Sequence, residues 1–339
     1  MAVYLRQADL KHDEQLLIAF ARNHLELMDE ERFRWLYRDN PSGVARVWLA
    51  CDDHAEAPVG MAAVFPRRCY VAGEQVLGCV LGDFCISEKY RSLGPAVQLQ
   101  KACLSLVRDG EFACCFDFPS GGMLGVYKYL GLQPAGQSVR MVKYLKADGR
   151  TGQWAPLRSV SGLVFKAADL ALALRDRNSS QANDIEYRLD KETCSDEYRQ
   201  LAERIGSSLG DCTLRSPDYL NWRYRRHPSQ RYEFLAAYRG AELQSYCVFT
   251  VSDGHAGVVD LFGVPEEEPV RGLLTHLAAL LRERGVSTVS ISVLTSDARV
   301  RLLKKLGFWG RESVPVIGFD GNRTNFGARL LLMHGDRES

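Results

Sequence analysis

Three short stretches of this chain recur in the same order in its second half. The first member of each pair lies before residue 133 and the second after residue 221. The pairs are WLYRDNP with WRYRRHP (35–41 and 222–228), LGDFCIS with VVDLFGV (81–87 and 258–264), and YKYLGL with LKKLGF (127–132 and 303–308). One such match arises easily by chance, whereas three in the same order indicate a duplicated domain of about 150 residues.

The composition of the segment between the copies predicts where they meet. We expect a first domain over residues 1–146, a linker with an apolar helix over 147–185, and a second domain over 186–335. The polar, glycine-bearing stretch 148–153 is typical of a linker. We expect the apolar helix that follows to pack between the domains, because its polar positions do not form the basic face of a membrane-surface helix.

Within the first copy, hydrophobic periodicity predicts an α/β fold. Strands are expected around residues 45–53, 59–71 and 75–87, and a helix over 94–110 with Pro95 in its first turn, where a missing N–H is tolerated. The buried stretch 112–118 predicts a further strand, 121–131 a short helix and 138–145 a last strand. This order indicates a mixed sheet flanked by helices.

The loop 91–96, RSLGPA, connects the long strand to the long helix. Such a junction presents unpaired backbone N–H groups and the positive end of the helix dipole. Gly94 allows a tight turn and the close approach of an anion, and Arg91 adds a positive charge. The loop is suited to a pyrophosphate, although short glycine motifs also occur in ordinary turns.

Two motifs together resemble the GNAT acyltransferase superfamily. The pattern Arg-x-x-Gly-x-Ala at 91–96 is similar to its acyl-CoA signature, and Ser120, Tyr127, Gly131 and Leu132 match its second signature, with Ser120 in place of the usual Asn. The resemblance covers most of residues 1–146. It implies a protein of two tandem GNAT-like acyl-CoA acyltransferase domains.

The resemblance also implies roles for individual residues. The pantetheine arm of the coenzyme is expected to pair with backbone groups of Phe84 and Ile86 and to pass Ser120. The residues expected to hold the pyrophosphate are Arg91 and the backbone amides of Ser92, Leu93, Gly94 and Ala96.

The resemblance makes Tyr127 the acid that protonates the leaving thiolate. A phenol with a reference pKa of about 10 carries its proton at neutral pH. Packing under the sheet is the alternative for this side chain. Asp83 lies near the expected acyl group and is either the general base or a residue that orients the acceptor or hydrogen-bonds within the sheet.

The second copy lacks both motifs. Glu268, among three consecutive acids, takes the place of Arg91, and carboxylates there repel a pyrophosphate. Leu303 takes the place of Tyr127 and has no proton to donate. We therefore expect a degenerate copy that shapes the acceptor side.

These observations predict an N-acyltransferase that moves an acyl group, with acetyl favoured, from acetyl-CoA to a primary amine of a small molecule such as an amino sugar or amino acid. A catalytically silent acyl-CoA-binding sensor or scaffold is one alternative. A transferase of the same fold that uses an acyl carrier protein or aminoacyl-tRNA is another.

The charge balance and the cysteine content limit which partners and which location we expect for this protein. The chain has 43 Lys and Arg against 42 Asp and Glu, so it offers no broad basic surface for nucleic acid. The ten cysteines and seven histidines show no zinc-ligand spacing, so no metal is expected. With no signal peptide or apolar run long enough for a membrane span, we expect a cytoplasmic protein, either a monomer with an internal pseudo-dimer or a homodimer.

Overall fold

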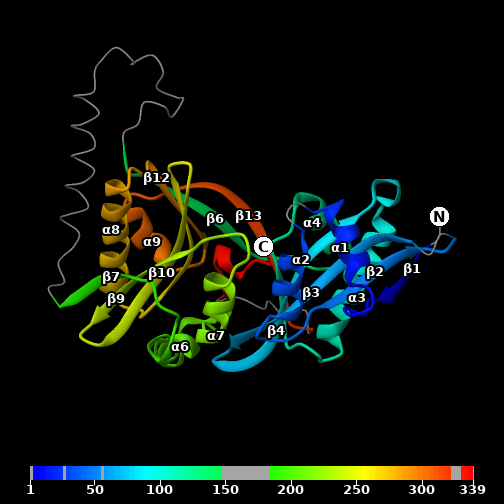
Figure 1. Ribbon diagram of the computed structural model, residues 1–339, viewed down its shortest axis with the longest axis horizontal. Helices are drawn as coiled ribbons and strands as arrows, with labels where there is room; N and C mark the ends of the chain where they lie inside the picture. Colours follow the sequence, from blue (N-terminus) through cyan, green and yellow to red (C-terminus); the bar gives the residue numbers. More distant parts are fainter. Residues whose placement is uncertain (1–2, 26–27, 55–56, 147–183, 322–329, 339) are drawn as a thin grey trace, which may run out of the picture. The chain divides into compact units, whose positions relative to one another are not determined.

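The fold is described from a computed structural model of the chain (Figure 1). The structure describes residues 3–25, 28–54, 57–146, 184–321 and 330–338. The predicted linker and its apolar helix lie outside the described residues. The chain forms two compact units, Met1–Gln137 with Gly206–Ser229 and Val314–Ser339, and Ser138–Ile205 with Gln230–Ser313.

The first unit is built on antiparallel strands that follow one another in the chain. They are β1 (Val3–Gln7), β2 (Arg46–Asp52), β3 (Pro58–Val71) and β4 (Glu74–Ile86). The short strand β5 (Cys115–Asp117) then pairs in parallel with β4. The mixed sheet that the hydrophobic pattern predicts is therefore confirmed.

Helices complete the first unit. They are α1 (Glu14–Arg22), α2 (Glu30–Phe33), the long α3 (Leu93–Arg108), α4 (Gly121–Tyr129) and α7 (Pro217–Leu220). Helix α3 buries Leu99, Cys103 and Leu104 against the sheet, where they join Val64 and Leu81 in one core cluster. An apolar stripe at helical spacing faces an apolar sheet face, which is what holds the start of α3 beside the end of β4.

The second unit repeats this arrangement. Its elements are β7 (Ile185–Asp190), α6 (Asp196–Leu209), β9 (Glu233–Arg239), β10 (Glu242–Ser252), β11 (His255–Gly263), α8 (Glu267–Glu283), β12 (Thr288–Leu294) and α9 (Arg299–Lys305). As β4 does with β5, β11 pairs in parallel with β12 after a long helical crossover. The duplication that the repeated motifs predict therefore appears again in the order of the elements.

The two copies exchange their last strands. β6 (Pro134–Tyr144) belongs to the first copy, yet its residues from Ser138 onward pair with β12 of the second unit. β13 (Trp309–Phe319) belongs to the second copy, yet Ile317–Phe319 pair with β5 of the first unit. Each compact unit thus contains a strand from the other copy, which is why neither unit is a continuous stretch of chain.

The repeated tryptophan motifs meet inside the first unit. Each forms a π-helix, at Arg34–Arg38 and at Asn221–Arg225. The two indole rings stack with centroids 4.9 Å apart. Trp35 Nε1 donates to the carbonyl of Trp222, and Trp222 Nε1 donates to the carbonyl of Trp35, each at 2.9 Å. The segment 206–229 is thereby anchored to the N-terminal copy.

Candidate active site

The strands β4 and β5 separate at the centre of the first unit. Their paired residues end at Val80 and Phe116, while β4 continues from Leu81 to Ile86 and the chain after Asp117 turns away toward α4. On the other side of β4 the register with β3 shifts between Met61 and Ala63. Asp83 lies in this bulge with φ of +43°, a conformation that non-glycine residues adopt rarely. The edge of β4 is therefore open to an added extended group.

The N-terminus of α3 lies at the end of this gap. Ser92 is the N-cap residue, and its side chain does not cap the helix. Pro95 has no N–H, so Ser92, Leu93 and Gly94 carry the amides that the geometry of a helix start leaves unpaired. A Cβ built on Gly94 meets no atom within 4 Å. This helix start is therefore an exposed anion cradle with open space above it.

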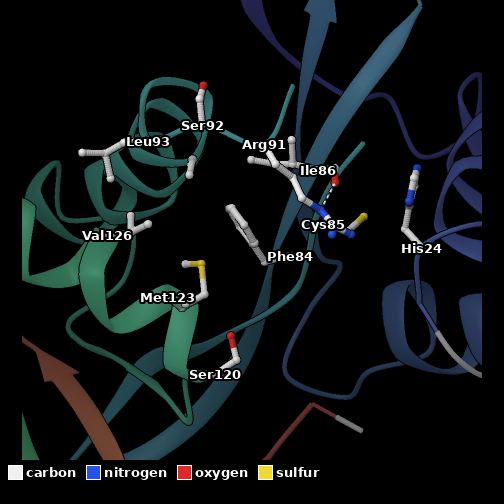
Figure 2. A pocket seen from close by; sticks show the side chains of 12 residues that line it. His24, Phe84, Cys85, Ile86, Arg91, Ser92, Leu93, Ser120, Met123 and Val126 are labelled. Carbon is white, nitrogen blue, oxygen red and sulfur yellow. Dashed lines mark hydrogen bonds between the residues drawn. The ribbon is translucent and has the colours of Figure 1, made fainter. Parts of the chain in front are cut away.

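A cavity of about 550 Å³ lies between the end of β4, the start of α3 and helix α4. Figure 2 shows the ring of Phe84 projecting into it between the two helices and the arginine loop. The residues that line it are His24, Phe84, Cys85, Ile86, Arg91, Ser92, Leu93, Ala96, Ser120, Gly122, Met123 and Val126. The cavity is thus apolar along α4 and polar at the loop.

The structure brings most of the predicted coenzyme-binding residues together around this cavity. Seven of the eight line it: Phe84, Ile86, Arg91, Ser92, Leu93, Ala96 and Ser120. Gly94 is exposed in the same loop but does not line the cavity. Their roles toward a coenzyme remain predictions.

Arg91 is held at the mouth of the cavity by its own loop. Its Nε donates to the carbonyl of Ile86 at 3.3 Å, as Figure 2 shows, and one of its terminal nitrogens lies 4.0 Å from Glu88. The side chain is 65% exposed. An exposed guanidinium at the end of an anion cradle is free to turn toward a phosphate.

A second cavity of about 240 Å³ adjoins the first. The two share Phe84, Ser120 and Met123 as lining residues. The rest of its lining combines Gln100 and three acidic residues with apolar and small residues: Asp83, Asp117 and Glu338, beside Leu25, Ala63, Leu81, Gly82, Phe118 and Pro119. Its wall is therefore much more acidic than that of the first cavity.

Tyr127 lies behind these cavities rather than in their walls. It is 1% exposed and belongs to the core cluster of the first unit. Its hydroxyl donates to Asp117 at 2.5 Å and accepts from Gln100 Nε2 at 2.8 Å. Burial, followed by the charge of Asp117, raises the pKa of Tyr127 well above its ordinary value. The phenol thus keeps its proton. It is connected to the second cavity by its hydrogen bond to Asp117, which lines that cavity.

Asp83 is enclosed by two side chains that the sequence analysis did not single out. Arg32 donates to both carboxylate oxygens at 2.9 Å, and the Tyr37 hydroxyl donates to Oδ2 at 2.7 Å. Burial lowers the pKa of Arg32, but the charge and the hydrogen bonds of Asp83, with smaller contributions from Tyr37 and Glu338, together raise it overall. Both oxygens of Asp83 are therefore already engaged by hydrogen-bond donors. This geometry favours the orienting role of Asp83 over the role of general base.

The C-terminal segment brings Glu338 into the second cavity. Arg215 forms an ion pair with Asp336 at 2.8 Å, and Arg223 donates to the carbonyls of Gly335 and Arg337 at 2.9 Å. The Arg215 and Asp336 side chains are 1% and 0% exposed. These contacts fix the last described residues, so that Glu338 reaches the wall near Gly82. No local sequence signal connects Glu338 with Asp117.

The equivalent region of the second unit is filled by its own side chains. The Arg299 guanidinium donates to the carbonyl of Leu261 on β11 and binds Asp297 through both carboxylate oxygens. Leu261 follows Asp260, which corresponds to Asp83 in the repeat. Helix α8 begins with Glu267 and Glu268. One carbonyl of β11 beside Asp260 is therefore already hydrogen-bonded, and the helix start carries negative charge.

Comparisons with known proteins bear on the fold. No family model matches the sequence, and no curated protein matches it. Among solved structures, a GCN5-related N-acetyltransferase from Anabaena variabilis is 14% identical, with a TM-score of 0.69 over 96% of this chain and 74% of that one. A probable N-acyltransferase from Enterococcus faecalis is 12% identical, with a TM-score of 0.66 over the same shares. The chain has the GNAT fold, in two tandem copies.

A longer-chain acyltransferase shares the same GNAT fold. Saccharomyces cerevisiae N-myristoyltransferase with bound myristoyl-CoA is 13% identical, with a TM-score of 0.56 over 94% of this chain and 82% of that one. Known proteins with this fold therefore use acyl donors of very different length.

The described residues offer no candidate for two other kinds of site. No group of three or more His, Cys, Asp or Glu among them is placed to hold a metal ion. No helix within the described ranges has the length and hydrophobicity that a bilayer crossing requires.

Proposed function

We propose that this GNAT protein is an N-acyltransferase that transfers an acetyl group from acetyl-CoA to a primary amine of a small molecule, an amino sugar or amino acid. One observation carries the proposal. The open edge of β4, the uncapped start of α3 and the cavity between them are contiguous and lie in one copy. This is the combination that an extended pantetheine arm ending in a pyrophosphate needs.

The second cavity supports acetyl as the transferred group. An acyl chain longer than acetyl would extend past Phe84 and Met123 into a space of about 240 Å³ with three carboxylates in its wall. Burying an alkyl chain against the acidic part of this wall is unfavourable, because the carboxylates lose their remaining contact with water. A cationic amine gains from the same wall.

A screen for thiol release tests the proposal. The full chain is incubated with acetyl-CoA and, in separate reactions, with amino sugars, amino acids and polyamines, and free CoA thiol is measured against protein-free controls. We expect turnover with at least one amine, and faster turnover with acetyl-CoA than with butyryl-CoA or myristoyl-CoA. Tight binding of acetyl-CoA with no thiol release from any amine would favour the silent sensor.

The buried position of Tyr127 is the observation that favours such a sensor. Protonation of the thiolate by Tyr127 requires its hydrogen bond to Asp117 to open, because its hydroxyl lies behind the cavity wall. A protein that binds acyl-CoA without turnover would have no such requirement. The thiol-release screen decides between the two functions.

A further inference from the structure

A row of three side chains connects the core of the first unit to the acidic cavity. Gln100 on α3 donates to the Tyr127 hydroxyl on α4 at 2.8 Å, and that hydroxyl donates to Asp117 at the end of β5 at 2.5 Å. Gln100 and Tyr127 are 2% and 1% exposed. The Asp117 carboxylate ends this row and also lines the cavity. A buried polar row of this kind fixes the orientation of its last member.

We propose that Asp117 is the proton acceptor for the attacking amine, with Tyr127 and Gln100 as its positioning residues. This inference rests on the acyl transfer proposed above. It assigns the smaller cavity to the acceptor amine and the larger one to the coenzyme.

The shared wall of the two cavities supports this division. Phe84, Ser120 and Met123 line both spaces, so a group bound in the smaller cavity lies directly beyond the end of the larger one. An amine there faces the acyl group of a donor that lies along β4. Attack requires the two reacting atoms to lie about 3–3.5 Å apart, and adjoining cavities make such an approach geometrically feasible.

Among the carboxylates of the cavity wall, Asp117 has the chemistry of a base. Both oxygens of Asp83 accept from the Arg32 guanidinium, and Oδ2 also accepts from the Tyr37 hydroxyl. Asp117 accepts from the neutral Tyr127 hydroxyl through its Oδ2. The contacts of Asp83 therefore engage both of its oxygens, whereas the Tyr127 contact engages one oxygen of Asp117.

Several groups act on the charge of Asp117 from the elements packed around it. Burial raises the pKa of Asp117 to about 7, the Tyr127 hydrogen bond on α4 lowers it, and the charge of Glu338 raises it again. Arg337 lowers it, and the thiols of Cys103 on α3 and Cys115 on β5 face the same Tyr127–Asp117 pair. A base with a pKa near the working pH combines a usable ionised fraction with a real affinity for the proton.

The proposed step starts from the neutral amine, so an ammonium ion that binds at the wall first releases one proton to water. The nitrogen lone pair then forms a bond to the thioester carbonyl carbon, whose C=O π pair moves onto the oxygen, while Asp117 takes the proton that the nitrogen loses. The C–S bond then breaks and its electron pair remains on the sulfur. The π bond re-forms as the leaving group departs. Asp117 returns its proton to the thiolate, directly or through water, so that CoA leaves as the thiol and the carboxylate is restored.

The test compares the wild-type chain with Asp117→Asn, using acetyl-CoA and hydroxylamine. Hydroxylamine is a small nucleophilic amine that needs few specific contacts. Asn keeps the size of Asp and can still accept from Tyr127, so the fold and acetyl-CoA binding, measured by calorimetry, are expected to persist. We expect kcat for thiol release to fall by about 10²–10⁴-fold, the usual effect of losing a positioned acid or base. The protein-free reaction measures the part of the acid-side decline that comes from protonation of hydroxylamine itself. The further decline that the wild type shows on the acid side of pH 7 should disappear in the variant.

Glu338→Gln changes a second acidic residue of the same cavity wall. Because the charge of Glu338 raises the pKa of Asp117, this variant should move the acid-side decline to lower pH. A purely structural role of the wall carboxylates would not shift the profile in this direction. Asp109→Asn, at an exposed position at the end of α3, is the matched control and should keep both the turnover and the pH profile of the wild type.

The outcomes separate the two proposals. A wild-type chain that binds acetyl-CoA and releases no thiol overturns the transferase function, and the assignment of Asp117 with it. A wild-type chain that releases thiol, beside an Asp117→Asn variant with the same rate and the same pH profile, overturns the assignment of Asp117 alone.

Discussion

Ionisation of Asp117 lowers the stability of the folded protein, because burial raises the pKa of this carboxyl in the folded state to about 7. An aspartate in an unfolded chain titrates at about 3.9. Between these values the folded chain binds a proton that the unfolded chain has released, so stability falls as pH rises from about 4 to about 7. Asp117→Asn removes this contribution.

We therefore expect Asp117→Asn to lose part of the decline in Tm that the wild type shows over this pH range. Thermal unfolding followed by circular dichroism at constant ionic strength measures it. Curves for the two proteins that run parallel from pH 4 to 7 would mean that Asp117 titrates normally.

Tyr127 allows a second test at the residue scale. Tyr127→Phe removes the hydroxyl from both Asp117 and Gln100, and leaving buried polar groups unpaired costs about 1–3 kcal/mol of stability. Because that hydrogen bond lowers the pKa of Asp117, its loss should move the acid-side decline of the rate to higher pH. Turnover slows in a saturating assay while acetyl-CoA binding stays nearly intact. Unchanged turnover and an unchanged pH profile would make Tyr127 a packing residue.

At the scale of elements, the paired tryptophans carry an interaction that can be measured directly. Trp222 is 1% exposed, stacks on Trp35 and exchanges two hydrogen bonds with it. Truncation of a buried tryptophan to alanine costs about 3–5 kcal/mol. We expect Trp222→Ala and Trp35→Ala each to destabilise the chain by about this amount in urea unfolding.

The double variant provides the control for this pair. Residues in direct contact are not additive, so Trp35→Ala with Trp222→Ala should cost clearly less than the two single changes together. Strict additivity would show that the two rings do not stabilise each other.

The strands and helices of the first copy could be predicted because each carries a strong local signal. Long alternating or apolar runs gave β3 and β4, and Pro95 after a polar loop marked the start of α3. The exchange of β6 and β13 could not be predicted in this way. A strand pattern shows that a segment pairs with others, but it does not show which edge the segment joins.

The candidate site likewise combines residues that a local sequence signal marks with residues that only the folded chain brings together. The residues of the coenzyme loop lie within a few positions of one another and carry a recognisable motif, and seven of the eight predicted residues line one cavity. Arg32, Asp117 and Glu338 come from distant parts of the chain. Their proximity depends on the bulge in β4 and on the buried arginines that hold the C-terminal segment.

The whole molecule is a duplicated GNAT fold in which the two copies differ at the proposed donor site. In the first copy β4 continues past its pairing with β5, and the first turn of α3 has no acidic residue. In the second copy, Arg299 donates a hydrogen bond to the carbonyl of Leu261, and helix α8 starts with acidic residues. The chain should accordingly bind one acyl-CoA and not two.

Calorimetric titration of the full chain with acetyl-CoA tests this central claim most directly, with Gly94→Glu and Gln98→Glu as paired variants. A side chain at Gly94 meets open space, so glutamate is tolerated there but places volume and negative charge in the anion cradle. Gln98→Glu adds the same charge one turn further along the exposed side of α3. We predict one site per chain in the wild type and in Gln98→Glu, and no measurable binding in Gly94→Glu. Two sites per chain, or undiminished binding in Gly94→Glu, would contradict this account.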